Sequence, residues 1–318
     1  MKNQKNLSLN NFWIAYNPDR AEIVITSEDP LVKGKPFRIT LSNKSSTYDT
    51  LLEVMRSEGV IGEEEQPLPN ELITENAEET NVPGEDPRTH IRVGKHPNDK
   101  FAEINLKSAS HTIIFGGVGS GKSSLLRLVS AHALENKGYI DLYGVALTEL
   151  DLKPYFREDA SKLATSTEKA AELFQEVIEL VYSRYSQMEK QGVQSYLNTD
   201  MKAVYLVVDD IGRILNGPHS DNHSSKFALD QLEKISQLGR AAGVYLFVSC
   251  RPSEYSTIPG SLRSNFDRRI VLGMVDTATC TLLLKDKPRF RGTLLNTRGR
   301  AVISVYGDQR LAQIYLQK

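Results

Sequence analysis

The pattern of apolar and polar positions divides the chain into a short β-rich part and a long part in which strands and helices alternate. Near the N-terminus, β-branched and aromatic residues form short extended runs, followed by one amphipathic segment. Runs of this composition are typical of strands. The pattern predicts strands over residues 12–16, 21–26 and 36–41 and a helix over 46–57. We therefore expect a small β-rich N-terminal module, in which Trp13 is a core residue.

The second part of the chain alternates short buried runs with longer segments whose apolar residues recur at helical spacing. Predicted strands cover residues 111–115, 203–208, 244–249 and 269–272, and predicted helices cover 124–134, 165–188 and 231–242. Strands that alternate with helices are typical of a mostly parallel sheet between two layers of helices. The pattern thus predicts a three-layer α/β domain.

An acidic segment lies between the two parts. From Gly62 to Pro87 there are nine Asp or Glu residues, four prolines and no Lys or Arg. Such a composition buries too little apolar surface to order itself, and its like charges extend it. We expect a module over 1–61, a flexible linker over 62–90 and an α/β domain over 91–318. The linker is either a solvated tether or an acidic arm that shields a basic surface.

Composition argues against a membrane-spanning protein, an exported protein and a zinc-binding protein. No window approaches 18 uninterrupted apolar residues, and the first residues lack the apolar core of a signal peptide. Cys250 and Cys280 are the only cysteines and lack the spacing of a zinc site. We therefore expect a cytoplasmic protein without a transmembrane segment of its own.

A phosphate-binding loop stands between the predicted strand at 111–115 and the predicted helix at 124–134. Residues 116–123 read G-G-V-G-S-G-K-S, which is the complete G-x-x-x-x-G-K-S pattern. In such a loop the backbone N–H groups surround the phosphates, the lysine contacts the β and γ oxygens, and the serine hydroxyl binds Mg²⁺. The sequence thus predicts ATP and Mg²⁺ as cofactors on a RecA-like P-loop NTPase core. The expected contacts are Gly116, Gly117, Val118, Gly119, Ser120, Gly121, Lys122, Ser123 and Ser124.

Two acidic residues follow a buried run further along the chain. Six apolar residues, 203–208, end in Asp209 and Asp210. Since parallel strands deliver the residues that follow them to one edge of the sheet, these carboxylates should lie near the phosphate loop. We expect Asp209 to hold Mg²⁺ together with Ser123, and Asp210 to polarise the attacking water.

The order of these motifs resembles the motor domain of the FtsK/SpoIIIE (FtsK/HerA) family over roughly residues 91–318. The likeness extends beyond the phosphate loop to five further stretches. They are Glu189-Lys-Gln-Gly-Val with Tyr196, Leu238-Gly-Arg240-Ala-Ala-Gly-Val-Tyr-Leu, Arg251-Pro252, Asn265-Phe-Asp-Arg-Arg-Ile, and Arg298-Gly-Arg300-Ala, the last similar to relatives that serve conjugation and secretion. The resemblance implies a homohexameric motor with ATP at subunit interfaces. By position, Arg240 corresponds to the family's arginine finger, which would act on the γ-phosphate of the neighbouring subunit.

Three positions depart from the family pattern. Asp210 stands where the family commonly has Glu, Cys250 stands where it usually has Gln, and Asp141-Leu-Tyr143 replaces Asp-Pro-Lys. We expect Ser249 to substitute for the missing Gln by hydrogen bonding, and Cys250 to be a packing residue rather than a nucleophile.

Basic residues gather near the C-terminus. Lys285, Lys287, Arg289, Arg291, Arg298 and Arg300 stand close together against one acid, Asp286. Such a cluster is either a DNA-facing surface or a solvated face. With the family resemblance, it indicates an ATP-dependent double-stranded DNA translocase of a mobile element, acting in transfer, packaging or segregation. A secretion or conjugation coupling ATPase that recruits a relaxase, a secretion substrate or a membrane-bound partner is the alternative. A nucleotide-gated assembly factor is the third.

Overall fold

The computed structural model describes residues 80–96, 100–147, 151–216, 223–273, 276–286 and 298–315, together with the backbone of four strands nearer the N-terminus. The chain divides into two compact units, Met1–Leu72 and Ile73–Lys318.

The first unit contains an antiparallel sheet. Its strands β1 (Lys5–Leu9), β2 (Phe12–Asn17), β3 (Glu22–Ser27) and β4 (Phe37–Ser42) lie side by side in chain order. The last three agree with the sequence prediction, whereas β1 was not predicted, because Lys5–Leu9 is mostly polar. The helix predicted over 46–57 lies outside the described residues. These strands form the β-rich unit that the sequence predicts.

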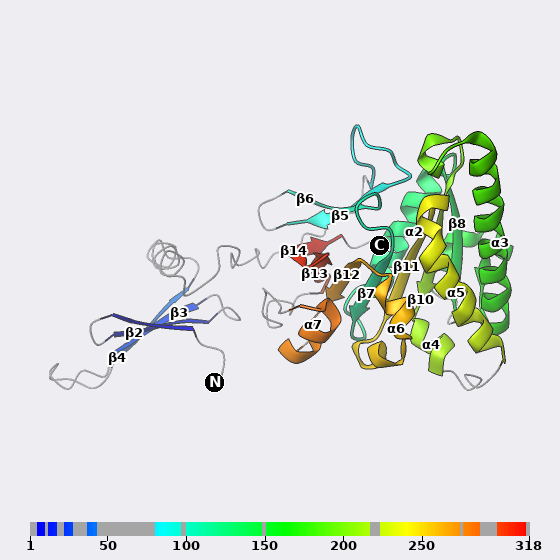
Figure 1. Ribbon diagram of the computed structural model, residues 1–318. Helices are drawn as coiled ribbons and strands as arrows, with labels where there is room; N and C mark the ends of the chain where they lie inside the picture. Colours follow the sequence, from blue (N-terminus) through cyan, green and yellow to red (C-terminus); the bar gives the residue numbers. More distant parts are fainter. Residues whose placement is uncertain are drawn as a thin grey trace. The chain divides into compact units, whose positions relative to one another are not determined.

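The second unit is built on a ten-stranded sheet in the order β6-β5-β14-β13-β12-β7-β11-β10-β8-β9 (Figure 1). Its strands are β5 (His90–Lys95), β6 (Phe101–Asn105), β7 (Thr112–Gly116), β8 (Ile140–Ala146), β9 (Leu163–Ala164), β10 (Ala203–Asp209), β11 (Val244–Cys250), β12 (Arg268–Leu272), β13 (Arg300–Val305) and β14 (Asp308–Ile314). The six strands from β12 to β9 are parallel, and the other four extend the sheet antiparallel.

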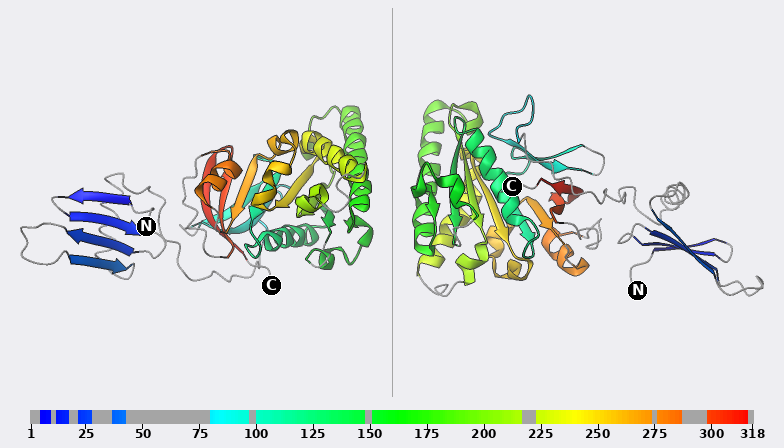
Figure 2. Two further views of the ribbon diagram at one scale, coloured as in Figure 1. Left: turned by 90° about the horizontal axis from the view of Figure 1, so that it is seen from below. Right: turned by 180° about the vertical axis from the view of Figure 1, so that it is seen from behind.

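Helices cover both faces of this sheet, as expected for a three-layer α/β domain (Figure 2). The chain runs from β7 through α2 (Lys122–Glu135) to β8, and then returns in the opposite direction through α3 (Thr167–Gln191) to β10 and through α5 (His223–Ala242) to β11. Because crossovers between parallel strands are right-handed, the reversal places α3 and α5 on the face opposite α2. The remaining helices are α4 (Ile211–Asn216), α6 (Gly260–Ser264) and α7 (Thr277–Leu284), with 3-10 turns η1 (Lys153–Phe156), η2 (Ala160–Lys162), η3 (Tyr196–Asn198) and η4 (Pro252–Thr257).

The central strands are buried along their whole length. Every residue of β7, β10 and β11 is inaccessible to solvent or nearly so, as expected for strands covered on both faces. This arrangement fixes the carboxyl ends of β7, β10, β11 and β12 at one edge of the sheet. The same edge carries the phosphate loop.

Residues 80–90, which the sequence assigns to the end of the linker, belong to the second unit and contact its helix α2. The buried Thr80 hydroxyl lies 2.8 Å from His132 Nδ1 and donates to Glu135 on α2, and His90 begins β5. The prediction of a flexible linker treats the whole acidic segment as one stretch of uniform composition. Its last residues are nevertheless ordered, because polar groups such as the Thr80 hydroxyl find hydrogen-bond partners on the folded helix α2.

Candidate active site

The phosphate loop turns from the end of β7 into the N-terminus of α2. Gly121 precedes the helix with φ +111°, a conformation that side-chain-bearing residues rarely adopt. No acidic residue occupies the first turn of α2, so the positive end of the helix dipole faces the loop unopposed. Both features suit a loop that surrounds an anion.

Lys122 directs its ammonium into this loop. Its Nζ donates to the carbonyl oxygens of Gly116 at 2.8 Å and Gly117 at 2.9 Å. Two of the three ammonium donors are thus used at the start of the loop, and one remains for a phosphate oxygen. Burial lowers the pKa of Lys122, while the nearby carboxylates of Asp209 and Asp210 oppose the shift.

The loop is braced by the C-terminal part of the chain. The N–H of Gly299 donates to the Ser120 carbonyl at 3.1 Å, and the N–H of Gly273 donates to the Arg300 carbonyl at 3.1 Å. The Gln313 side chain donates a hydrogen bond from Nε2 to the Arg298 carbonyl oxygen at 3.0 Å. The segment that starts β13 therefore lies directly against the phosphate loop.

Ser249, at the end of β11, joins the two acids that follow β10. Its hydroxyl donates to Asp209 Oδ1 at 2.7 Å and accepts the N–H of Asp210 at 2.7 Å. The sequence predicts that Ser249 takes the place of the missing Gln by hydrogen bonding, and in the structure its hydrogen is donated to Asp209. Ser249 thus holds the carboxylate of Asp209 and the backbone of Asp210.

Asp210 is held from several sides. It has φ +57°, in the left-handed region, and its side chain is 14% exposed. Its Oδ2 accepts from Arg213 Nε at 3.1 Å and from Arg251 Nη2 at 3.0 Å. A positive φ at a non-glycine residue is uncommon and costs about 1–3 kcal/mol, and it persists where surrounding contacts offset that cost, as the contacts of Asp210 do here.

Asp209 presents a carboxylate suited to a hard cation. It is 8% exposed, and burial raises its pKa, an effect that the Ser249 hydrogen bond opposes. Oδ1 is engaged by Ser249, so Oδ2 is the oxygen left for a ligand. Mg²⁺ prefers oxygen ligands and binds through one or two carboxylates plus phosphates, so a Ser123 hydroxyl and an Asp209 carboxylate fit it.

A known protein family matches the second unit of this chain. The sequence profile of the FtsK/SpoIIIE family matches residues 73–286. The chain belongs to the FtsK/SpoIIIE family.

Relatives in this family are distant. DNA translocase FtsK of Listeria monocytogenes is 21% identical over 209 residues, which are 59% of this chain and 27% of that protein. The chain therefore spans about a quarter of the length of the curated relatives it matches.

Solved structures show the same fold. The conjugation coupling protein TcpA of pCW3, solved with ATPγS, superposes with a TM-score of 0.66 at 15% identity, covering 98% of this chain and 88% of that one. EssC (ATPases 2 and 3) from Geobacillus thermodenitrificans superposes with a TM-score of 0.59 at 19% identity, covering 79% of this chain and 48% of that one.

Arg240 of this FtsK/SpoIIIE chain lies apart from its own phosphate loop. It stands in the last turn of α5, immediately before β11 begins, and its Nη2 donates to the Lys107 carbonyl at 3.1 Å. α5 runs antiparallel to the central strands, so its end reaches the amino edge of the sheet. The loop and the acids lie at the carboxyl edge.

The remaining sequence-predicted residues divide into buried and exposed ones. Cys250 is fully buried, and burial raises its pKa to about 12, so it is a packing residue and not a nucleophile. Arg300 is also buried, at 8% exposure, so its side chain belongs neither to a DNA-facing surface nor to a solvated face. Lys285 and Arg298 are exposed. Lys287, Arg289 and Arg291 lie outside the described residues.

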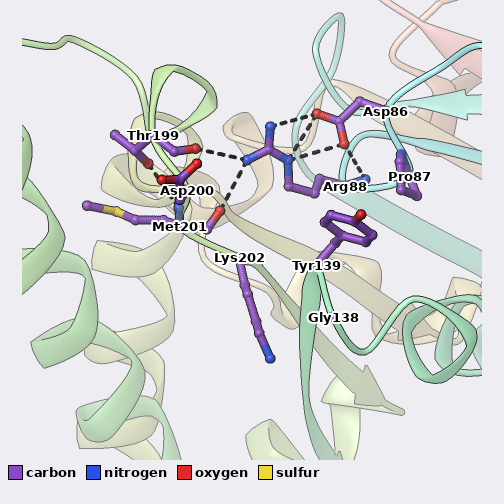
Figure 3. Close-up of a pocket in the computed structure, with 9 residues that line it drawn as sticks. All are labelled: Asp86, Pro87, Arg88, Gly138, Tyr139, Thr199, Asp200, Met201 and Lys202. Carbon is purple, nitrogen blue, oxygen red and sulfur yellow. Dashed lines mark hydrogen bonds and ion pairs between the residues drawn. The ribbon is translucent and has the colours of Figure 1, made fainter.

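A pocket of about 640 Å³ lies at the opposite edge of the sheet, near the starts of β8 and β10 (Figure 3). Within it, Arg88 bonds Asp86 and the carbonyls of Thr199 and Met201. The Arg88 guanidinium is therefore already paired with a carboxylate and two carbonyl groups of the protein itself.

Among the described residues no helix is long and apolar enough to cross a membrane.

Sequence reasoning missed the two arginines that hold Asp210 as members of the site. Arg213 belongs to no motif, and Arg251 was identified only as part of a family signature. Arg213 could have been found, because it stands three residues after Asp210 at the start of a helix, where such pairs meet.

Proposed function

We propose that this chain is an ATPase that uses hydrolysis to move double-stranded DNA, as a homohexameric ring. The observation that carries the proposal is the phosphate loop with its lysine beside two acids held by hydrogen bonds, in a member of the FtsK/SpoIIIE family. Curated relatives named DNA translocase FtsK support the choice of DNA as the cargo.

The residues of the site divide the work of phosphoryl transfer. The N–H groups of the loop and Lys122 bind the phosphates, Ser123 and Asp209 hold Mg²⁺, and Asp210 orients the attacking water. When bound there, Mg²⁺ would supply positive charge that neutralises the phosphate groups. Ser249 holds the Asp209 carboxylate and the Asp210 backbone, and Arg213 and Arg251 hold the Asp210 carboxylate, which lowers the reorganisation needed during the reaction.

Arg240 completes the site of a neighbouring subunit in this proposal. Its position at the amino edge keeps it away from the ATP of its own subunit. A guanidinium supplied across an interface stabilises the charge that develops at the γ-phosphate, and links hydrolysis to the geometry of the ring.

We propose that the protein acts in the cytoplasm or at the periphery of a membrane complex, in DNA transfer, packaging or segregation, with residues 1–61 as a separate module. The exposed Lys285 and Arg298 are candidates for contact with DNA phosphates.

A second candidate is a coupling or secretion ATPase that recruits protein substrates at a membrane complex. The fold shared with the conjugation coupling protein TcpA and with EssC favours this candidate.

The deciding experiment measures ATP hydrolysis with and without linear double-stranded DNA across a range of salt concentrations. We expect DNA to stimulate hydrolysis and the stimulation to fall steeply with salt, because phosphate contacts release counterions. Lys122→Ala is the inactive control. Hydrolysis that is unaffected by DNA, with no movement along it, would sink the translocase proposal, and stimulation by a partner protein instead would favour the coupling ATPase.

A further inference from the structure

A turn at the amino edge of the sheet lies beside Arg240. It covers residues 105–109, between β6 and β7, and its carbonyl groups accept hydrogen bonds from side chains of three other parts of the fold. One of these donors is Arg240 itself, at the end of α5, whose Nη2 lies 3.1 Å from the Lys107 carbonyl oxygen. Because the Arg240 side chain is exposed, this carbonyl restrains it only as far as the turn is itself fixed.

Arg268, on β12, fixes both ends of the turn. Its side chain is fully buried, and it donates from Nη1 to the Ala109 carbonyl at 2.8 Å and from Nη2 to the Asn105 carbonyl at 2.7 Å. Burying a charged group is costly unless its N–H groups are hydrogen-bonded. The planar guanidinium spans two carbonyls at once, which the compact ammonium of a lysine does less well. The buried charge of Arg268 therefore serves to fix the shape of the turn.

Tyr306 holds the middle of the turn from the hairpin between β13 and β14. Its hydroxyl lies 3.2 Å from the Ser108 carbonyl oxygen and 3.1 Å from Asp267 Oδ2, and it can donate to either. The φ of Tyr306 is +50°, and Gly307 follows with φ +87°. Two-residue hairpin turns with positive φ at both positions favour Asn-Gly, so an aromatic residue in the first position is uncommon. The hairpin thus carries an unfavourable backbone conformation at the residue whose hydroxyl reaches the turn.

We propose that Arg268 and Tyr306 are positioning residues for the arginine finger: they fix the turn 105–109, whose Lys107 carbonyl anchors the Arg240 guanidinium at the amino edge. This inference rests on the proposed role of Arg240 at the ATP site of a neighbouring subunit. A guanidinium has five N–H donors, so one bond to a carbonyl leaves four for a phosphate. The anchor therefore restrains the side chain without using up the group that acts.

Such a restraint matters because an arginine side chain is long and has many rotamers. Ordering a side chain of this kind during the reaction adds to the barrier, whereas a finger that is already anchored has lost most of that freedom. The phosphate loop lies at the opposite edge of the sheet, so ATP binding does not depend on this turn. Loss of the turn's supports should therefore lower kcat and leave the KM for ATP nearly unchanged.

The first test measures hydrolysis by the full chain with Tyr306→Phe and with Arg268→Met. Tyr306 is 65% exposed, so its replacement by Phe preserves the fold, whereas Arg268→Met also lowers the Tm because the side chain is buried. For Tyr306→Phe we expect a kcat about threefold to tenfold lower, which is the cost of ordering one long side chain expressed as a rate. Tyr182→Phe is the matched control, since that tyrosine is 52% exposed on α3.

Mixed rings show whether the defect follows the finger or the loop. In rings of Arg240→Ala and Lys122→Ala subunits, the finger comes from the Lys122→Ala chain and the loop from the Arg240→Ala chain. We expect Tyr306→Phe to reduce the recovered hydrolysis when it is placed in the Lys122→Ala chain, and to have no effect when it is placed in the Arg240→Ala chain. Equal effects in the two chains would contradict the proposal, because a general structural defect does not distinguish them.

The single variants separate this inference from the proposed function. If Arg240→Ala is inactive while Tyr306→Phe has the kcat of the wild type, the finger stands and its positioning by Tyr306 is wrong. If Arg240→Ala hydrolyses ATP as fast as the wild type, the finger itself is wrong, and the inference fails with it.

A second readout does not need ATP. The N–H groups of Lys107 and Ser108 donate to Asn105 Oδ1 at 2.9 and 3.3 Å, so their hydrogen exchange reports how well the turn is held. We expect these two amides to exchange faster in Tyr306→Phe and in Arg268→Met than in the wild type, and at the wild-type rate in Tyr182→Phe. Unchanged exchange in both variants would overturn the inference. If the wild type does not hydrolyse ATP but exchange in the turn is faster in both variants, the proposed function fails and the support of the turn stands.

Discussion

Ser249 is the residue on which both acids of the site depend. Its hydroxyl is the donor to Asp209 and the acceptor for the N–H of Asp210, and it is fully buried. In Ser249→Ala both partners lose their hydrogen bond, so we expect a loss of about 1–3 kcal/mol in the free energy of unfolding. We also expect at least a tenfold lower rate of hydrolysis with nucleotide affinity retained.

Denaturant unfolding, the rate of ATP hydrolysis and titration with a fluorescent ATP analogue check these expectations. The exposed Ser253, on the following turn, provides the control Ser253→Ala. Unchanged hydrolysis in Ser249→Ala would show that the acids keep their positions without this bridge.

His111 makes the stability of the second unit sensitive to acid. Its ring is fully buried, its Nδ1 accepts the N–H of Leu246 at 3.1 Å, and burial lowers its pKa to about 4. Because the unfolded chain binds a proton more readily, stability is present above the ordinary pKa and is lost as the pH falls from about 6.5 toward 4. We expect this group to account for up to about 3 kcal/mol over that range.

Urea unfolding at pH 7 and at pH 5 tests the expectation. The loss between the two values should be smaller in His111→Gln than in the wild type, and unchanged in His223→Gln, where the replaced ring is exposed. An equal loss in all three proteins would contradict it.

At the scale of the element, the direction of α5 determines which ATP site Arg240 can reach. The helix ends at the edge of the sheet opposite the phosphate loop. If Arg240 is the arginine finger that we propose, Arg240→Ala should abolish hydrolysis while preserving nucleotide affinity, because a finger acts on the reaction and not on binding.

Mixing two inactive variants distinguishes action between subunits from action within one. A ring of Arg240→Ala and Lys122→Ala subunits contains some interfaces with an intact loop on one side and an intact finger on the other. Hydrolysis should therefore return on mixing. No recovery on mixing, in rings shown to contain both variants, would count against Arg240 as a finger. Lys234→Ala, on the same helix but in an exposed ion pair with Asp230, is the control.

At the scale of the whole molecule, the position of the boundary between the units can be tested by truncation. The compact second unit begins at residue 73, whereas composition predicts a domain that begins at 91. A chain that starts at 91 lacks Thr80, Arg88 and His90, together with their bonds to α2 and to the segment before β10. We expect it to unfold at a Tm lower by several degrees than a chain that starts at 73.

Thermal unfolding of the two truncated chains beside the full chain provides the measurement. Equal Tm values for the two truncated chains would show that residues 80–90 contribute little to stability.

The alternation of strands and helices, the phosphate loop and the acid pair could all be predicted from the sequence. The periodicity of apolar residues reports local geometry, and the loop motif requires particular residues at fixed spacing within one strand-loop-helix segment. Asp209 and Asp210 were found because a buried run ends in them. These features depend on neighbours along the chain, which the sequence displays directly.

Tertiary structure alone decided how distant segments meet. The antiparallel strands β5, β6, β13 and β14 join the sheet only through pairings with one another and with β12. Gly299 reaches the phosphate loop, and Arg251 reaches Asp210, because strand order brings separate segments to one edge. The sequence by itself determined which chemical groups the site contains. The order of the strands and the connections between them determined which of these chemical groups are in contact. Contact between segments far apart in the sequence depends on topology and not on local periodicity.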